Sequence, residues 1–291
     1  MEQGTDVAGG KISTGIRVVV VEDEIIVARD IEMKLKKLGY NVLDIATSGE
    51  EAIQKAGDLL PDLMLMDITL EGKMDGIEAA GQIDALYNIP IVYLTAHTDL
   101  DTLSRARVTE PYGYIIKPFA IRDLLVTISM ALYKHRMEAR NKVINQILKV
   151  FLKPITLKEK LEQSLGLITS IPRLFLQTKG SIFLVEDDPN VLVMKASLGT
   201  ADCESVTAGK CLCGVAAATK EIVFAERIDK RHELNQDALP HGHYCVPILA
   251  ANKLLGVICA YVREGHKRDS ADEEVLISFA DIIANVLSYS K

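Results

Sequence analysis

Between Ile16 and about Ala131, short apolar runs alternate with stretches whose apolar residues follow a helical spacing. The five runs are IRVVVV, NVLDIA, DLMLM, IPIVYL and YGYII, and the stretches between them include EIIVARDIEMKLKKLG and DGIEAAGQIDAL. Near-continuous β-rich runs that alternate with helices are typical of a parallel sheet covered by helices on both faces. The sequence therefore predicts an α/β, doubly wound domain with a five-stranded parallel sheet. Because crossovers in such a sheet are right-handed, the loops after the strands lie along one edge, where ligands bind.

Polar side chains stand at the ends of four of these predicted strands. They are Glu22 and Asp23 after the first run, Asp67 after the third, Thr95 after the fourth and Lys117 after the fifth. Clustered carboxylates repel one another and need a cation, and Mg²⁺ suits a site with carboxylates, waters and phosphate oxygens. A phosphoryl group could then transfer in line to Asp67. Lys117 would offer the phosphoryl group a positive charge, and Thr95 would offer a hydroxyl.

This set of residues, with the segments KPF and LEGKMDGIEAA, resembles the receiver domain of two-component response regulators, over about Ile16 to Leu132. The resemblance implies a flavodoxin-like fold that a sensor histidine kinase phosphorylates with the help of Mg²⁺. The resemblance implies that Asp67 is the phosphoacceptor and that Glu22 and Asp23 form the acidic pocket. Asp23, Asp67 and the backbone carbonyl of Thr69 would be the Mg²⁺ ligands. Thr95 and Tyr114 would be switch residues, and Lys117 would be the lysine before a cis proline, Pro118. We expect these residues to meet at one edge of the sheet.

The second half of the chain repeats the apolar-then-acidic pattern of the first strand in the stretch IFLVEDDPNVLVMK. Here Asp, Pro and Asn stand at positions that favour a tight turn, so the stretch predicts a hairpin whose acids need no chemical role. Further strands are expected at EIVFA, YCVPIL and KLLGVICAYV, and a closing helix from about Ser270 to Ser288. Clustered hairpins with helices at the ends favour an antiparallel α+β domain.

The segments GKCLCGVAAATKEIVFAE and HYCVPILAANKLLGVICAYV resemble a GAF domain over about Leu157 to Tyr289. The resemblance implies a module that senses a small molecule or dimerises, built around a six-stranded antiparallel sheet. It does not identify the ligand.

All five cysteines lie in this half of the chain, and several stand close to histidines. In PHGHYCVPI the alternating residues His241, His243 and Cys245 would lie on one face of an extended chain. The candidate ligand or metal site is Cys211, Cys213, His232, His241, His243 and Cys245. Thiolates and imidazoles together suit zinc, iron or copper, with iron and zinc the metals we name for this site. The alternatives are thiol redox chemistry between Cys211 and Cys213, or ordinary pocket and core residues, and Cys259 is expected in the core.

Between the two halves, the stretch from Phe119 to Lys153 has no strong helix breaker before Pro154. A helix of this length could pair with a copy of itself, although an ordinary last helix followed by a kinked linker fits the same pattern. We place a flexible tail at 1–15, the receiver domain at 16–135, a helical linker at 136–156 and the GAF-like domain at 157–291.

The formal net charge of −7 argues against a nucleic-acid surface, and no apolar stretch is long enough to span a membrane. The N-terminal residues lack an apolar signal core, so we expect a cytoplasmic protein. The leading hypothesis is a signalling protein rather than an enzyme: a phosphorylated, homodimeric response regulator whose output passes to a downstream protein by contact. One alternative is a metal- or thiol-based redox or gas sensor regulated by the receiver. The other is a dimerising adaptor with a vestigial GAF pocket.

Overall fold

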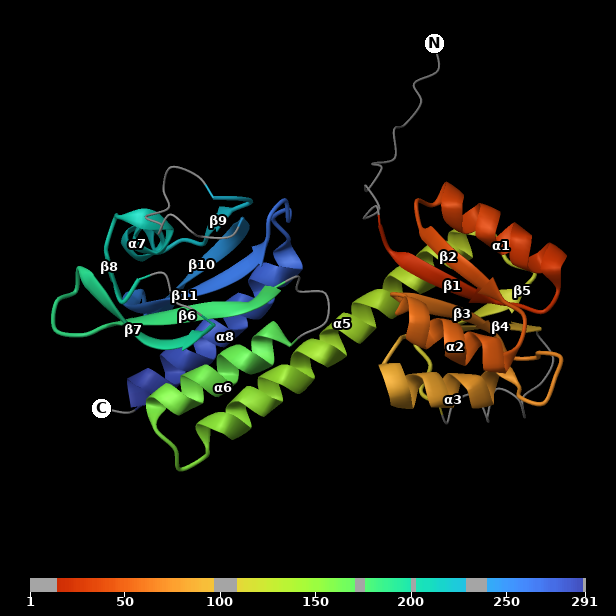
Figure 1. Cartoon of the computed structure of the whole chain (residues 1–291), viewed down its shortest axis with the longest axis horizontal. Coiled ribbons are helices and arrows are strands. Elements are labelled where there is room, and N and C mark those ends of the chain that lie inside the picture. The colour runs from red at the N-terminus through yellow and green to blue at the C-terminus, as the bar shows by residue number, and fades with distance from the viewer. Residues whose placement is uncertain (1–14, 97–108, 171–175, 200–202, 229–239, 290–291) are drawn as a thin grey trace, which may run out of the picture. The chain divides into compact units, whose positions relative to one another are not determined.

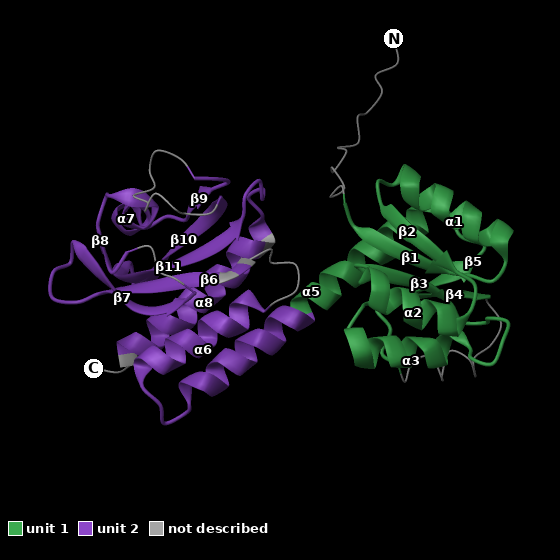
Figure 2. Ribbon diagram, viewed as in Figure 1, with its two compact units in different colours: residues 1–137 green, residues 138–291 purple. Residues whose placement is uncertain are grey.

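The computed structural model describes residues 15–96, 109–170, 176–199, 203–228 and 240–289. The chain divides into two compact units, residues Met1–Met137 and residues Glu138–Lys291 (Figure 2). Each unit has its own sheet and its own hydrophobic core.

The first unit contains a five-stranded parallel sheet with the order β2-β1-β3-β4-β5 (Figure 1). Its strands are β1 (Arg17–Val21), β2 (Asn41–Ala46), β3 (Leu63–Asp67), β4 (Ile91–Ala96) and β5 (Gly113–Lys117). The helices described in this unit are α1 (Ile25–Lys37), α2 (Gly49–Leu59), α3 (Gly76–Tyr87) and the first part of α5 (Ile121–Phe151). This strand order is that of the flavodoxin-like doubly wound fold, so the predicted fold class is confirmed.

Both faces of this sheet are buried, which explains why its strands read as continuous apolar runs. Val19, Val21 and Met66 pack into one core cluster with α2 and α3 residues. Val18 and Val20 pack into a second cluster, on the opposite face, with residues of α1 and α5. Successive side chains of a strand point to opposite faces, so the buried positions of β1, Val18 to Val21, are all apolar when helices cover both faces.

The second unit contains a six-stranded antiparallel sheet with the order β8-β7-β6-β11-β10-β9. Its strands are β6 (Leu176–Val185), β7 (Val191–Leu198), β8 (Ser205–Thr207), β9 (Val223–Ala225), β10 (His241–Ala250) and β11 (Lys253–Arg263). Its other helices are α6 (Leu157–Thr169), α7 (Cys211–Thr219) and α8 (Ser270–Tyr289). The predicted EDDPN hairpin is the connection between β6 and β7, and the antiparallel sheet confirms the predicted class of this half.

Two separate apolar clusters cover this second sheet. Residues of α6 and α8, such as Leu165 and Phe279, form the larger cluster with β6, β10 and β11. Residues of α7 form the smaller cluster with the alternate positions of the same strands, including Cys245 and Cys259. The cysteines therefore lie on the α7 face of the sheet.

Helix α5 contributes to the cores of both units. Leu124 and Ile128 pack in the first unit, whereas Val143 and Ile147 pack in the second. The segment that the sequence suggested as a linker thus forms a continuous helix through Phe151, and part of the second core rests on it. None of the helices in the described part of the chain combines the length and apolarity that a membrane span requires.

Candidate functional site

The acidic residues expected at the sheet edge do meet there. Strands β1 and β3 are neighbours, so Glu22 and Asp23, which follow β1, lie beside Asp67 at the end of β3. Oxygen atoms of the three carboxylates lie within 4.8 Å of one another. Glu22 is fully buried and Asp67 is 7% exposed. The sequence prediction of an acidic cluster is therefore realised geometrically.

Lys117, at the end of β5, joins this cluster. Its Nζ donates to Glu22 Oε2 at 2.6 Å and to Asp67 Oδ2 at 2.5 Å. Burial raises the pKa of Glu22 to about 7, and the charge of Asp67 adds to this, although the bond from Lys117 opposes it. Burial lowers the pKa of Lys117, but its bonds to the two carboxylates outweigh this and leave that pKa raised. The carboxylates of Glu22, Asp23 and Asp67 thus outnumber the single ammonium group of Lys117 at this edge.

A divalent cation fits this donor set. Among the described residues, Glu22 Oε1 is buried without a hydrogen-bond partner. Asp23 is less buried, and its Oδ2 accepts the backbone N–H of Glu71 at 3.0 Å. Oxygen ligands from one or two carboxylates, with waters completing the shell, are what Mg²⁺ prefers. Asp23 and Asp67 are the side chains that would hold the ion.

The β3–α3 loop holds Asp67 closely against the backbone. The backbone N–H of Thr69 donates to Asp67 Oδ1 at 3.0 Å, and the N–H of Gly76 donates to Ile68 O at 3.0 Å. A Cβ atom at Gly76 would lie 1.8 Å from the Asp67 carbonyl oxygen. Only glycine, which has no Cβ atom, lets the backbone at position 76 lie this close to the Asp67 carbonyl oxygen. Sequence reasoning missed Gly76, although its place directly after Asp75, a residue type that caps helices, was a signal.

Of the two predicted switch residues, Thr95 lies near the same edge, whereas Tyr114 lies three residues before Lys117 on β5. Thr95 is buried near the end of β4, and its hydroxyl donates to the Ala96 carbonyl at 3.2 Å. Tyr114 on β5 is half-buried and packs on Tyr93, with ring centroids 5.8 Å apart. The peptide bond between Lys117 and Pro118 is cis.

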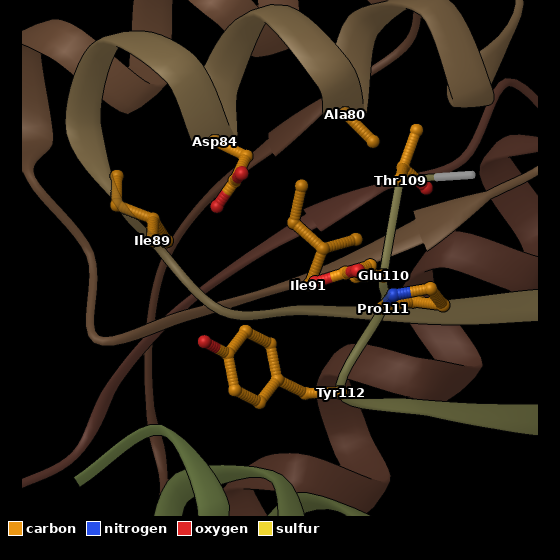
Figure 3. Close-up of a pocket in the computed structure, with 8 residues that line it drawn as sticks. All are labelled: Ala80, Asp84, Ile89, Ile91, Thr109, Glu110, Pro111 and Tyr112. Atoms are coloured by element: carbon orange, nitrogen blue, oxygen red, sulfur yellow. The ribbon is translucent and has the colours of Figure 1, made fainter. Parts of the chain in front are cut away.

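A small hollow of about 10 Å³ lies between α3 and the segment that leads into β5 (Figure 3). Its lining includes Asp84, Ile91 and Tyr112, and no residue of the acidic cluster. A space this small holds at most about one water molecule. This hollow is therefore separate from the acidic cluster.

In the second unit the structure gathers only part of the predicted cysteine and histidine set. The sulfur atoms of Cys213, Cys245 and Cys259 lie within 4.8 Å of one another, with Cys213 and Cys245 3.4 Å apart. His243 Nδ1 lies 3.2 Å from Cys259 Sγ. Cys211 is half-buried next to Cys213.

Two predicted residues of this set remain, His241 and His232. The ring of His241 packs on that of His243, with centroids 4.5 Å apart. His232 lies outside the described residues.

Cys259 is the member of this cluster that the sequence analysis placed only in the core. It is 2% exposed, so the expected burial is correct. The missed point is that the β10–β11 register pairs Cys245 with Cys259, which brings both thiols to the same face. The hairpin formed by YCVPIL and KLLGVICAYV carried this signal, because residues paired across two antiparallel strands share a face.

Comparison with known protein families identifies both units. Residues 18–129 match the response regulator receiver domain, and residues 166–288 match the GAF domain. The chain therefore contains a response regulator receiver domain followed by a GAF domain.

Known proteins resemble the receiver part. The transcriptional regulatory protein PdtaR of Mycobacterium tuberculosis is 38% identical over 120 residues, which span 41% of this chain and 58% of that protein. The signal receiver domain of a modulated diguanylate cyclase from Desulfovibrio desulfuricans G20 is 41% identical over 42% of this chain and 97% of that structure, with a TM-score of 0.41. The N-terminal domain of a response regulator/sensory box/GGDEF protein from Carboxydothermus hydrogenoformans is 37% identical over 42% and 98%, with a TM-score of 0.40.

Proposed function

We propose that Asp67 accepts a phosphoryl group from a sensor histidine kinase in a Mg²⁺-dependent reaction. The observation that carries this proposal is the convergence of Asp67, two further carboxylates and the Lys117 ammonium at one edge of a receiver sheet. A single buried carboxylate could be structural, but three with one lysine form a site that attracts a cation and a phosphate.

In the reaction, an Asp67 carboxylate oxygen attacks the phosphorus of a phosphohistidine. The new O–P bond forms as the N–P bond breaks, and the kinase imidazole leaves with the bonding electron pair. Mg²⁺, when bound, supplies positive charge that offsets the repulsion between the carboxylate and the phosphoryl oxygens. Lys117 can move its ammonium from Asp67 Oδ2 to the phosphoryl group. The Thr95 hydroxyl can turn from the Ala96 carbonyl to a phosphoryl oxygen.

The test is phosphorylation of the full chain by a small phosphodonor such as acetyl phosphate with Mg²⁺, measured as intact mass. We expect the wild type to gain one phosphoryl group and Asp67→Asn to gain none. The matched control is Asp58→Asn, which removes an exposed carboxylate of α2 and should leave the gain intact. Equal gains in the wild type and Asp67→Asn would overturn the assignment of the acceptor.

The GAF domain and the long helix suggest how this signal is used. We propose a cytoplasmic protein that couples phosphorylation to dimerisation and to a surface recognised by a downstream protein. Helix α5 supports this, because Val126, Met130 and Tyr133 are exposed along one face of its receiver part. These positions are separated by four and three residues, the spacing of an apolar stripe that can pair with another helix.

A further inference from the structure

Three cysteines meet in the interior of the GAF domain. Cys245 on β10 and Cys259 on β11 are register partners, and Cys213 on α7 packs over them. The three residues are 0%, 2% and 8% exposed, respectively. Their sulfur atoms lie within 4.8 Å of one another. The chain thus brings three potential thiolate ligands from three elements to one point.

An imidazole lies next to this point. His243 is two residues before Cys245 on β10, so the two side chains share a face of the sheet. Its Nδ1 lies 3.2 Å from Cys259 Sγ. The His243 ring contacts the rings of His241 and Tyr261, with centroid distances of 4.5 and 4.4 Å. These contacts hold the imidazole beside Cys259.

The spacing of these atoms agrees with a tetrahedral metal shell. Zinc bound to sulfur at ~2.3 Å and to nitrogen at ~2.0 Å places neighbouring sulfurs about 3.8 Å apart, and sulfur and nitrogen about 3.5 Å apart. The Cys213–Cys245 sulfur distance is 3.4 Å, and all three sulfurs lie within 4.8 Å of one another. The three sulfurs already lie close enough to share one ion, whereas the His243 nitrogen, which does not lie within 4.8 Å of all three, must move toward them to complete the shell.

We propose that Cys213, Cys245, Cys259 and His243 bind one Zn²⁺ ion in a closed structural site of the GAF domain. Three thiolates and one imidazole form a donor set of structural zinc sites, and softer donors favour zinc over Mg²⁺ or Ca²⁺. The burial of all four residues favours a closed shell over a site with an open position for a gas or substrate. Zinc would tie α7 to β10 and β11. This proposal is independent of phosphorylation at Asp67.

The first experiment is elemental analysis of the full chain, purified under reducing conditions without chelators or a metal-affinity step. We expect one zinc per chain in the wild type. Cys245→Ser and Cys259→Ser should lose it, whereas Cys203→Ser, which changes an exposed cysteine, should retain it. Asp67→Asn should also retain it, which distinguishes this site from the acidic cluster.

A second measurement uses the wild type, so that it does not depend on the folding of a variant. Cobalt added to zinc-depleted protein should give the intense visible bands of tetrahedral cobalt and a thiolate-to-cobalt charge-transfer band, and zinc should abolish both. His243→Ala should weaken zinc binding by more than the roughly 10–100-fold that loss of an outer-shell partner costs. Metal-free protein, iron or copper in place of zinc, a Cys213–Cys245 disulfide, or zinc retained by Cys245→Ser would each overturn the proposal.

Discussion

The proposed phosphorylation site contains one lysine that pairs with two buried acids. Lys117 contacts Glu22 and Asp67, whose side chains are 0% and 10% exposed. Charges held this far from solvent are screened weakly, so removing the lysine leaves two acidic groups uncompensated. The ion pairs of Lys117 therefore compensate the acids at this edge of the sheet.

We predict that Lys117→Met lowers the free energy of unfolding of the receiver by about 3 kcal/mol. The matched control is Lys55→Met, because Lys55 is similarly buried but pairs with the exposed acids Asp44 and Glu51. Loss of that surface pair should cost at most about 1 kcal/mol. Urea titration followed by circular dichroism measures both, and Mg²⁺ should restore stability only to Lys117→Met. Equal losses in the two variants would contradict this account.

A different buried acid makes the GAF domain sensitive to pH. Asp272 on α8 is 4% exposed and pairs with His266 at 2.7 Å. Burial raises its pKa from 3.8 to about 6, although the bond to His266 opposes the shift. As the pH rises, the Asp272 carboxyl therefore keeps its proton longer in the folded state than in the unfolded state. The stability that Asp272 contributes is complete below pH 3.8 and is lost as the pH rises to about 6.

We predict that Asp272→Asn flattens the pH dependence of GAF-domain stability between these two values. Across this pH window the free energy of unfolding of the wild type should fall by at most about 3 kcal/mol relative to that of the variant. Denaturant titrations at a series of pH values measure the slope. Asp281→Asn, on the exposed side of the same helix, should keep the wild-type slope. An unchanged slope in Asp272→Asn would show that its carboxyl does not titrate there.

At the scale of elements, the β3–α3 connection carries Asp67 into the site. Asp75 caps α3 by accepting the Glu78 N–H at 2.8 Å, and Gly76 begins the helix against the Asp67 carbonyl. The position of the acceptor is therefore set by backbone packing as well as by its own hydrogen bonds.

We predict that Gly76→Ala destabilises the receiver by about 1–3 kcal/mol, because the new methyl group would overlap the Asp67 carbonyl oxygen. It should also slow phosphorylation by moving Asp67. Gly81→Ala is the control in the same helix, where a Cβ atom meets only Thr109 Cγ2 at 3.7 Å. That change should stabilise α3 by up to about 1 kcal/mol. The measurements are thermal unfolding and the phosphorylation rate, and a stable, fully active Gly76→Ala would contradict the steric argument.

The elements show which parts of the molecule the sequence could predict. The inner strands β1, β3 and β4 were predictable, because burial on both faces forces continuous apolar runs, whereas the edge strands β2 and β5 are only partly buried. The acidic cluster followed from strand ends that share one edge. The thiol cluster was only partly predictable: the partnership of Cys245 and Cys259 depends on hairpin register, and the approach of Cys213 depends on how α7 packs. The hairpin sequence carries a signal for the first, whereas the local pattern does not encode the second.

At the scale of the whole molecule, α5 belongs to both units. Its first residues complete the receiver core and its last residues complete the GAF core. The sequence allowed two interpretations, one long helix or a shorter helix followed by a kinked linker, and α5 is continuous across the boundary between the units. The packing of Val143 and Ile147 explains why the helix does not end earlier. This helix is therefore the candidate element for dimerisation.

We predict a homodimer that forms through the exposed face of α5 in the receiver. Met130, which is 67% exposed, lies between Val126 and Tyr133 on that face. Met130→Glu should shift the protein toward monomer, and Asn145→Glu, at an exposed polar position of the same helix, should not. Light scattering with and without beryllofluoride, a phosphoryl mimic, measures the mass. A wild-type monomer under both conditions would contradict the prediction.

The central claim is that phosphorylation occurs at Asp67, and mapping the modified residue tests it most directly. Full-length protein is phosphorylated with Mg²⁺ and reduced with borohydride, which converts an aspartyl phosphate to homoserine, and its peptides are sequenced by mass spectrometry. We predict homoserine at position 67 and unmodified aspartate at Asp58 and Asp62 in the same peptide. Homoserine at another position, with Asp67 intact, would contradict the account.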